Sequence, residues 1–440
     1  MSKKRKKLPE GEFEADIESL SHGGRGIAKL NGKVTFIDNA LPGETVKFKY
    51  LKTQKQWDEG QATEIINSSP ERTEPVCPHY AQCGGCSLQH LKSQSQLKLK
   101  QDTLLEQLHH FAGLEPQAIL DPITGPTEHY RTKARLGARY VHKKASVLVG
   151  FREKFSHFVT DMQQCPILNS QVDKAIPALR QMLSELSVYN AVPQIEVAAS
   201  DNATALIIRH LEALTDQDYA LLRSFADKHD MLIYLQPKGP DTIHLLDDQY
   251  DRWLNYQLKA YDLTFYFYPT DFTQVNQTIN AKLVQLAINK LDLQPTDEVL
   301  DLFCGLGNFS LPIAQYAHSV TGIEGSEAMV NRATMNAKAN QITNTAFYQA
   351  DLTQIINTHP NWLKHYDKLL LDPPRSGAAE IVESINKLDV SKIIYVSCNP
   401  ATLARDSYTL KQQGYQLKEA GILDMFPHTS HVESIAVFEK

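Results

Sequence analysis

Apolar and polar positions alternate in five short runs near the amino-terminal end of the chain, and glycine, asparagine or proline separates the runs. The runs cover residues 13–17, 26–30, 34–37, 45–50 and 62–66. A period of two residues is typical of strands that bury one face. Five such strands within ~55 residues predict a small, closed, OB-like β-barrel, an architecture that often holds nucleic acid. Five basic residues, 3–7, precede the barrel, so the first predicted domain spans residues 1–69.

The middle of the chain predicts a second, β-rich domain. Alternating positions return over about residues 130–263, after a turn-rich segment at 67–78 and a polar helical stretch at 93–111. We assign residues 70–270 to this central domain. The helical segment 93–124 is expected to pack on the domain that follows.

From residue 271 the pattern changes to alternating helices and strands. Residues 281–291 and 310–317 have helical periodicity, and the apolar run 298–303 between them fits a buried strand. Alternation of this kind predicts a doubly wound, Rossmann-like α/β domain over residues 271–440.

Length and composition indicate a multidomain cytoplasmic protein. The chain has 440 residues, no run of the ~20 apolar residues that a membrane span needs, and no signal-peptide core after Met1. Six cysteines are too few for a disulfide scaffold in so long a chain, so a reducing compartment leaves them free for metal binding or catalysis. We expect a cytoplasmic location and no membrane partner, and infer no obligate protein partner.

Basic residues cluster although the formal net charge of the whole chain is −6. Residues 129–154 contain eight lysines or arginines and one acid, Glu153. Arg131, Lys133 and Arg135 alternate, so on a strand they would form one row that faces RNA phosphates. A solvated strand face is the alternative explanation for the same pattern.

The first strand of the α/β domain ends in a glycine-containing turn that suits a nucleotide-type cofactor. Gly305 and Gly307 follow the apolar run 299–303, at a place where backbone can approach a ligand closely. Acids end the next three strands, at Glu324, Asp351 and Asp372. This order favours S-adenosylmethionine, because a dinucleotide site needs a third glycine that the turn lacks. A helix cap or a loop charge is the alternative for each acid.

A cysteine follows another apolar strand of the same domain. Cys398 precedes Asn399-Pro400, a dipeptide that forces a turn and would present the thiol toward the cofactor pocket. Glu433 lies at the start of the last predicted strand. A thiol and a carboxylate at such a pocket indicate covalent catalysis assisted by a general base. The commoner role of a lone cysteine beside a strand is that of a small core residue.

Four motifs together resemble those of the RNA uracil-C5 methyltransferase family. They are Asp301-Leu302-Phe303-Cys304-Gly305-Leu306-Gly307-Asn308-Phe309, Asp372-Pro373-Pro374-Arg375, Ser397-Cys398-Asn399-Pro400 and His431-Val432-Glu433-Ser434. The resemblance implies that Cys398 adds to C6 of a uracil, that S-adenosylmethionine methylates C5, and that Glu433 removes the C5 proton. It also implies a set of cofactor-binding residues: Gln274, Phe303, Asn308, Glu324, Asp351 and Asp372, beside Gly305 of the turn.

Four cysteines outside this domain are candidate metal ligands. Cys77, Cys83 and Cys86 are spaced C-x5-C-x2-C, and Cys165 precedes a proline far downstream. Four thiolates in a reducing compartment can hold zinc or an iron–sulfur cluster. Three close cysteines with a remote Cys-Pro resemble cubane ligation more than paired zinc knuckles, and the family includes members with a [4Fe-4S] cluster at this spacing. We expect the cluster to shape an RNA-binding domain rather than to transfer electrons.

The combination of domains favours one branch of the family. The barrel resembles a TRAM domain, and a TRAM domain with cluster cysteines resembles the bacterial members that methylate 23S ribosomal RNA. One alternative is the same chemistry on another ribosomal or transfer RNA uridine. A second is a cluster-containing RNA-binding protein with an idle methyltransferase fold. A third is an amino-group methyltransferase, which Asp372-Pro373-Pro374 resembles but whose chemistry needs no cysteine.

Overall fold

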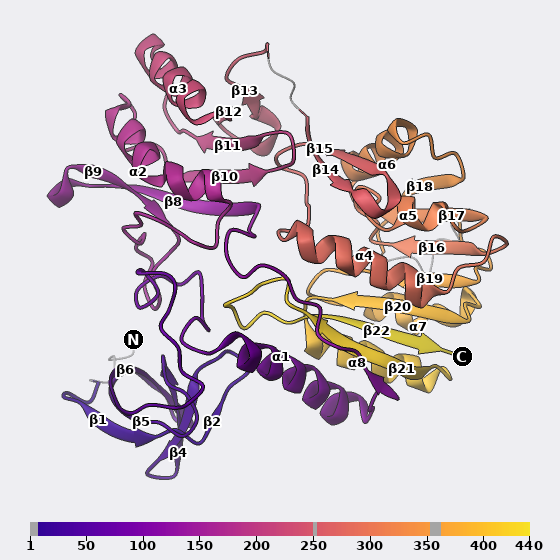
Figure 1. Cartoon of the computed structure of the whole chain (residues 1–440), viewed down its shortest axis with the longest axis horizontal. Coiled ribbons are helices and arrows are strands. Elements are labelled where there is room, and N and C mark those ends of the chain that lie inside the picture. The colour runs from indigo at the N-terminus through magenta and orange to yellow at the C-terminus, as the bar shows by residue number, and fades with distance from the viewer. Residues whose placement is uncertain (1–7, 250–252, 353–361) are drawn as a thin grey trace, which may run out of the picture.

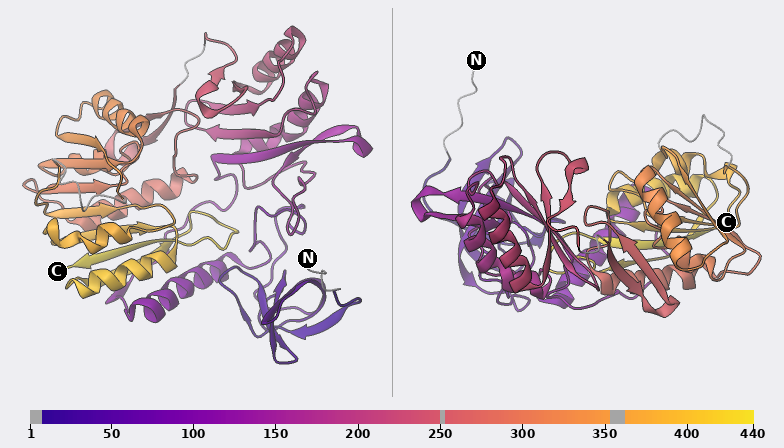
Figure 2. Two further views of the ribbon diagram at one scale, coloured as in Figure 1. Left: turned by 180° about the vertical axis from the view of Figure 1, so that it is seen from behind. Right: turned by 90° about the horizontal axis from the view of Figure 1, so that it is seen from above.

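The computed structural model describes residues 8–249, 253–352 and 362–440 and arranges them in three parts (Figure 1). The barrel and the central sheet lie on one side of the molecule, and the carboxyl-terminal α/β domain lies on the other (Figure 2). The basic residues 3–7 lie outside the described residues. None of the helices formed by the described residues is long and apolar enough to cross a membrane.

Six strands form the amino-terminal barrel. They are β1 (Phe13–Asp16), β2 (Ser19–Leu20), β3 (Gly26–Leu30), β4 (Lys33–Asp38), β5 (Thr45–Thr53) and β6 (Trp57–Asn67). Hydrogen bonds connect them in the order β1-β5-β6-β4-β3-β2. Because β1 and β2 are consecutive along the chain, the two ends of this order meet and the sheet closes. The core inside it includes Ile37, Val46 and Phe48, which confirms the predicted barrel.

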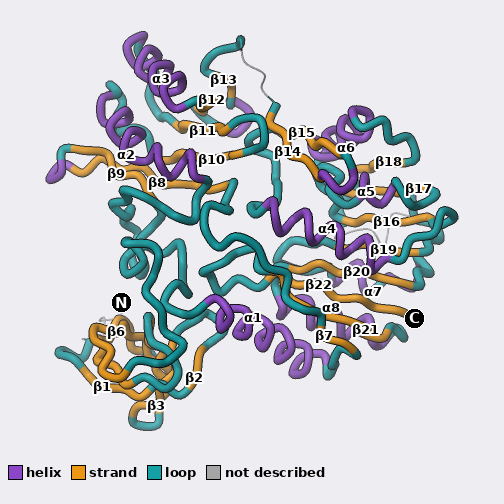
Figure 3. The backbone as a smooth tube through the Cα atoms, in the orientation of Figure 1, coloured by secondary structure: helices purple, strands orange, loops and turns teal. Residues whose placement is uncertain are grey.

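A long helix connects the barrel to the rest of the chain. α1 (Ser93–Gln107) continues into a π-helical turn, Leu108–Ala112. Leu104 and Leu108 are fully buried in the core of the α/β domain. The short strand β7 (Ala118–Ile119) then pairs with β21 (Gln416–Leu423) at the edge of the sheet of that domain. Residues from α1 to β7 therefore lie against the carboxyl-terminal domain (Figure 3).

The central domain is a six-stranded sheet with two helices. Its strands are β8 (Lys133–Val141), β9 (Ser146–Gly150), β10 (Gln194–Ala199), β11 (Thr204–Arg209), β12 (Met231–Gln236) and β13 (His244–Leu245), in the order β13-β12-β11-β10-β8-β9. The helices are α2 (Ser170–Glu185) and α3 (Asp216–His229), and both share one hydrophobic cluster with the sheet. The alternating pattern predicted a β-rich region here but neither helix.

A two-stranded hairpin follows, β14 (Leu254–Leu258) and β15 (Leu263–Phe267). Its residues Tyr256, Phe265 and Phe267 belong to the same hydrophobic cluster as α4 (Gln277–Leu291) of the α/β domain. The hairpin thus packs with the carboxyl-terminal domain, although it precedes residue 271.

The α/β domain contains an eight-stranded sheet in the order β18-β17-β16-β19-β20-β22-β21-β7. Its own strands are β16 (Glu298–Leu302), β17 (Ser319–Glu324), β18 (Thr345–Gln349), β19 (Lys368–Leu371), β20 (Lys392–Ser397), β21 (Gln416–Leu423) and β22 (Glu433–Glu439). The helices are α4 (Gln277–Leu291), α5 (Ser310–Ala314), α6 (Glu327–Ala339), α7 (Ala379–Glu383) and α8 (Pro400–Gln412).

Alternate strand residues of this sheet face two different cores. Val299 and Leu370 pack on the side of α4 and α5, whereas Leu300 and Leu371 pack on the side of α1 and α8. Strands β16 to β20 are parallel, and β22 is antiparallel to β20. The doubly wound, Rossmann-like prediction is confirmed. The carboxyl ends of the parallel strands meet at one edge, where ligands of such folds bind.

Candidate active site and cysteine pocket

Cys398, directly after β20, lies opposite Glu433, the first residue of the neighbouring strand β22. Ser397, the last residue of β20, pairs with Ser434 of antiparallel β22, so the next residues in the register are Cys398 and Glu433. Asp372 follows the adjacent parallel strand β19 at the same edge, and its charge reaches both groups. The sheet therefore brings together a thiol and two carboxyls that are far apart in the sequence.

Hydrogen bonds fix the turn that carries the thiol. Asn399 caps α8, because its Oδ1 accepts from the backbone N of Ala401 at 3.2 Å. Its Nδ2 donates to the carbonyl of Arg375 at 3.0 Å. The Arg375 guanidinium in turn donates to Nδ1 of His431 at 3.0 Å. The turn after Cys398 is thus tied to the Asp-Pro-Pro-Arg segment and to the loop before Glu433.

Burial has the largest effect on the pKa values of Cys398, Asp372 and Glu433. Glu433 is 3% exposed, and burial raises its pKa to about 8, with a further rise from Asp372 and an opposing effect of Arg375. Burial likewise raises the pKa of Asp372 to about 7. Burial and the Glu433 charge raise the pKa of the Cys398 thiol, and Arg375 lowers it. A carboxyl with a pKa near 8 is a stronger base than an ordinary carboxylate.

A cavity of about 310 Å³ lies beside Cys398, within the range of roughly 300–1,000 Å³ that is usual for ligand pockets. Three parts of the chain line it: Arg375, Cys398 and His431 of the α/β domain, Thr103 and Gln107 of α1, and His22 of the barrel. Gln107 Nε2 donates to Nδ1 of His22 at 3.4 Å. The barrel contribution was not predicted, since only the folded chain brings residue 22 to residue 398.

A larger cavity, of about 780 Å³, lies in the central domain. Polar residues at the start of α2, in the turn between β10 and β11 and at the end of α3 line it, among them Asn169, Asp201 and Asp230. It contains none of the predicted site residues, so the smaller cavity beside Cys398 is the candidate active site.

The turn after β16 has the backbone conformation of a ligand-binding loop. Phe303, Gly305 and Gly307 all have left-handed φ angles, of 65°, 54° and 93°. Glu324, at the end of β17, accepts from the backbone N of Gly305 at 3.2 Å and from that of Ser326 at 2.9 Å. The predicted acid and the predicted glycine turn are thus in direct contact.

Other predicted cofactor residues have different surroundings. The Asn308 amide exchanges two hydrogen bonds of 2.9 Å with Asn280 of α4, and the Tyr256 hydroxyl donates to its Oδ1 at 2.8 Å. Gln274 lies half-buried before α4, and Asp351 lies in the loop after β18. The pattern did not single out Asp301, which is fully buried and accepts from the Ser310 hydroxyl at 2.5 Å. An acid within an apolar strand was its only signal.

The four predicted ligand cysteines line one cavity of about 180 Å³. Cys77, Cys83 and Cys165 are buried, and Cys86 is half-buried. Among the described residues, no group of three or more His, Cys, Asp or Glu side chains converges closely enough to hold a single metal ion. The thiols therefore surround a space instead of meeting at one point. His431 also lines this cavity, so one side chain borders both the cysteine pocket and the Cys398 pocket.

The alternating basic residues divide between the interior and the surface. Lys133 is directed inward, with its amine donating to the carbonyl of Asp271 and lying 5.6 Å from the centre of the Phe267 ring. Arg131 donates to the carbonyl of Lys133 at 2.9 Å and borders the cysteine pocket. Arg135 has a side chain that is 69% exposed and pairs with Glu196 at 3.0 Å.

Comparison with known proteins identifies the family of the chain and of its amino-terminal domain. Residues 92–440 match the tRNA (uracil-5-)-methyltransferase family, and residues 10–63 match the TRAM domain. The 23S rRNA (uracil(1939)-C(5))-methyltransferase RlmD of Hahella chejuensis is 49% identical over 447 residues, with all of both chains covered. The protein of the same name from Alcanivorax borkumensis is 50% identical over 441 residues, covering 100% of this chain and 99% of the relative.

A solved structure shares the fold. It is the tRNA (uracil-54, C5)-methyltransferase of Pyrococcus abyssi in complex with S-adenosyl-L-homocysteine, with a TM-score of 0.73 and 23% identity. The match covers 97% of this chain and 100% of that one. The chain therefore belongs to the tRNA (uracil-5-)-methyltransferase family and carries a TRAM domain at its amino-terminal end.

Proposed function

We propose that this chain transfers a methyl group from S-adenosylmethionine to C5 of one uridine in 23S ribosomal RNA. The observation that carries the proposal is the register of β20 and β22, in which Ser397 pairs with Ser434, so that Cys398 comes opposite Glu433. The RNA target is that of the full-length relatives, which are about half identical to this chain and named for uracil 1939 of 23S rRNA.

The chemistry needs both groups in a fixed order. Uracil C5 is a poor nucleophile until the thiolate of Cys398 adds to C6 and pushes an electron pair toward C5. Bound S-adenosylmethionine supplies the methyl group that C5 then takes. Glu433 accepts the proton from C5, the electron pair of that bond re-forms the C5–C6 double bond, and the thiolate leaves. Arg375, which lowers the pKa of Cys398, favours the thiolate at the start and at the end.

The residues around the β16 turn fit a bound S-adenosylmethionine. The left-handed backbone at Gly305 and Gly307 leaves room for a ligand to approach the main chain. We propose that the cofactor contacts fall to Gln274, Phe303, Gly305, Asn308, Glu324, Asp351 and Asp372. Glu324 is already hydrogen-bonded to the turn, which orients its carboxylate before the cofactor enters.

The cysteine pocket fits a [4Fe-4S] cluster better than a zinc ion. A zinc ion would need all four sulfurs about 2.3 Å from one point, whereas here the thiols surround a cavity. A cubane cluster places its ligands around such a volume. We propose that Cys77, Cys83, Cys86 and Cys165 hold the cluster and that it has a structural role in the central domain.

The exposed side of β8 is the proposed RNA face. Arg135 and Arg139 lie on the same side of this strand and are exposed, while Lys133 is used within the fold and Arg131 borders the cysteine pocket. Two guanidinium groups on one strand face suit phosphate contacts. The target uridine must leave its stack to reach Cys398, as for other enzymes that modify a base.

Mapping of 5-methyluridine in ribosomal and transfer RNA tests the proposal. A strain that lacks this chain should lose one 5-methyluridine from 23S rRNA and keep those of its tRNA. Re-expression should restore the modification, and Cys398→Ala should not. Loss of a tRNA 5-methyluridine, or no loss at all, would contradict the assignment. An amino-group methyltransferase is disfavoured because its chemistry has no use for the thiol opposite Glu433.

A further inference from the structure

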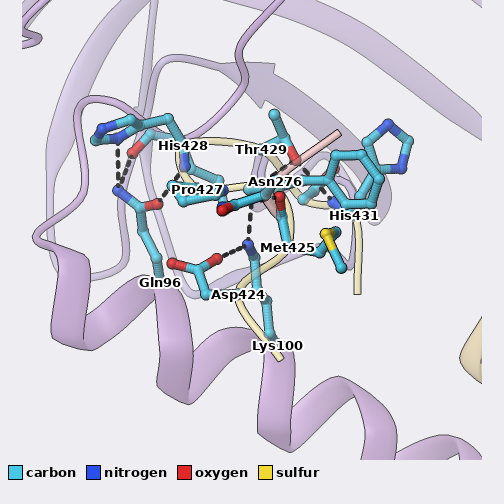
Figure 4. Close-up of polar contacts among 12 residues, drawn as sticks. Gln96, Lys100, Asn276, Asp424, Met425, Pro427, His428, Thr429 and His431 are labelled. Carbon is cyan, nitrogen blue, oxygen red and sulfur yellow. Dashed lines mark hydrogen bonds and ion pairs between the residues drawn. The ribbon is translucent and has the colours of Figure 1, made fainter. Parts of the chain in front are cut away.

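The loop between β21 and β22, residues 424–432, ends at Glu433 and has no regular secondary structure (Figure 4). His428 within it has a left-handed φ of 65° and is 6% exposed. A non-glycine residue in this conformation is strained and persists only where its surroundings hold it. The contacts that hold His428 therefore also determine where the chain enters β22.

Helix α1 holds the loop from one side. Lys100 Nζ pairs with Asp424 Oδ1 at 2.6 Å and donates to the carbonyl of Phe426 at 3.0 Å. One turn earlier in α1, Gln96 Oε1 accepts from the backbone N of His428 at 2.9 Å. Both side chains point from the helix into the loop in Figure 4.

The segment that directly follows Cys86 holds the loop from the other side. Ser87, next to Cys86, and Leu88 both donate from their backbone N to the carbonyl of His428, at 3.0 and 2.9 Å. The backbone N of Ser430 donates to the Ser87 hydroxyl at 2.9 Å. Gln96 links the two sides, because its Nε2 also donates to the carbonyls of Leu88 and Leu91, at 3.0 and 2.7 Å.

The ion pair between Lys100 and Asp424 is buried, and a contribution to stability alone does not explain why a charged pair lies there. Lys100 has a side chain only 1% exposed, and its partner Asp424 is 7% exposed. Replacing a buried ion pair by apolar residues of similar volume is often neutral or stabilising, so such a pair is weak support for the fold but can fix one geometry. The geometry fixed here is that of a loop that leads into Glu433.

We propose that Gln96 and Lys100 are positioning residues for the removal of the C5 proton. Through Asp424 and His428 they hold the loop so that the Glu433 carboxyl faces C5 of the bound uracil. This inference rests on the proposed role of Glu433. A displacement of a reacting group by about 1 Å can cost on the order of 10²-fold in rate.

The two positioning residues affect the last step more than the earlier ones. Cys398 follows β20, and the Arg375 carbonyl beside it is held by Asn399 and Thr402, none of which belongs to the loop. Among the described residues, only the hydrogen bond from Arg375 to His431 joins this turn to the loop. Addition of the thiol and methylation of C5 therefore depend less on the loop contacts than proton removal by Glu433 does. A displaced loop slows proton removal, and the methylated RNA stays joined to Cys398.

The test uses Gln96→Met and Lys100→Met in the full-length protein loaded with its cofactors. Gln96→Met removes the hydrogen bonds without changing a charge, so it carries the test if Lys100→Met does not fold. Lys98→Met is the matched control, because Lys98 lies on the same helix in an exposed pair with Asp102. The measurements are kcat and KM for a 23S rRNA fragment, and the fraction of enzyme joined to RNA on a denaturing gel at steady state.

The expected result for the Gln96 and Lys100 variants is a fall in kcat of at least tenfold, a parallel fall in KM that leaves kcat/KM nearly unchanged, and a clear rise in the joined species. Lys98→Met should match the unmodified protein. Glu433→Gln runs in parallel as the reference for a blocked last step. If Glu433→Gln accumulates the joined species and folded Gln96→Met does not, the positioning role is wrong and the proposed function stands. If Glu433→Gln does not accumulate it, the assigned mechanism falls and the positioning role with it.

Discussion

Glu433→Gln should make the α/β domain more stable than it is in the unmodified protein, and this difference should grow as the pH rises. The carboxyl of Glu433 has a pKa of about 8 in the folded chain, against an ordinary value of 4.5. The folded state therefore keeps a proton that the unfolded state loses between pH 4.5 and 8, and the stability of the unmodified protein falls with pH across that window. Glutamine does not titrate and lacks this loss.

The magnitude follows from the gap between the two pKa values. At about 1.4 kcal/mol per pH unit, the free energies of unfolding of the variant and the unmodified protein differ by about 5 kcal/mol above pH 8. At pH 7 the difference is about 3 kcal/mol, and at pH 4.5 it approaches zero. The same substitution should slow turnover by about 10²–10⁴-fold, the usual contribution of a general base.

Hydrogen exchange of β22 is a suitable assay, because a chain of several domains does not unfold in one two-state step. Protection of the amides of residues 433–439 would be compared at pH 5, 7 and 8.5, after correction for the intrinsic exchange rate. The control is Glu380→Gln, which removes an exposed carboxyl on α7. A difference in protection between Glu433→Gln and the unmodified protein that does not grow with pH would contradict the raised pKa of Glu433.

Two further predictions concern the central domain. Protein purified without oxygen should contain iron and sulfide, and stoichiometric zinc without iron would contradict the proposed cluster. Cys83→Ala or Cys165→Ala should lower the yield of folded protein and not only the rate of methylation, since ligation is part of the folding free energy. Replacing Arg135 and Arg139 by alanine should make the slope of log RNA affinity against log salt concentration shallower, by roughly 0.7–0.9 for each phosphate contact that is lost. The control is Arg223→Ala, which removes an exposed arginine. An unchanged slope would mean that this face is only solvated.

The sequence was most informative where a reactive or polar residue stands at the end of an apolar strand. The motifs around Cys398 and Glu433 predicted one catalytic pair, and the pairing of Ser397 with Ser434 brings these two residues next to each other in the fold. Gly305 and Glu324 were likewise predicted as parts of one site, and they share a hydrogen bond.

Long-range packing explains what the sequence did not reveal. Helix α2 was missed although Val172, Ile176 and Leu179 repeat at helical spacing, because strands of similar apolar content flank it. Lys133 alternates with other basic residues, but its amine turns inward to Asp271 of a distant segment. No local pattern predicts that His22 of the barrel borders the Cys398 pocket.

The proposed reaction is methylation of C5 of a uridine in 23S rRNA through Cys398. Release of tritium from 23S rRNA labelled at uracil C5 reports on this reaction at the reacting atom. The full-length protein with S-adenosylmethionine should release one tritium for each methyl group transferred, and Cys398→Ala should release none. Release from labelled tRNA but not from 23S rRNA would contradict the substrate, and release by Cys398→Ala would contradict the mechanism.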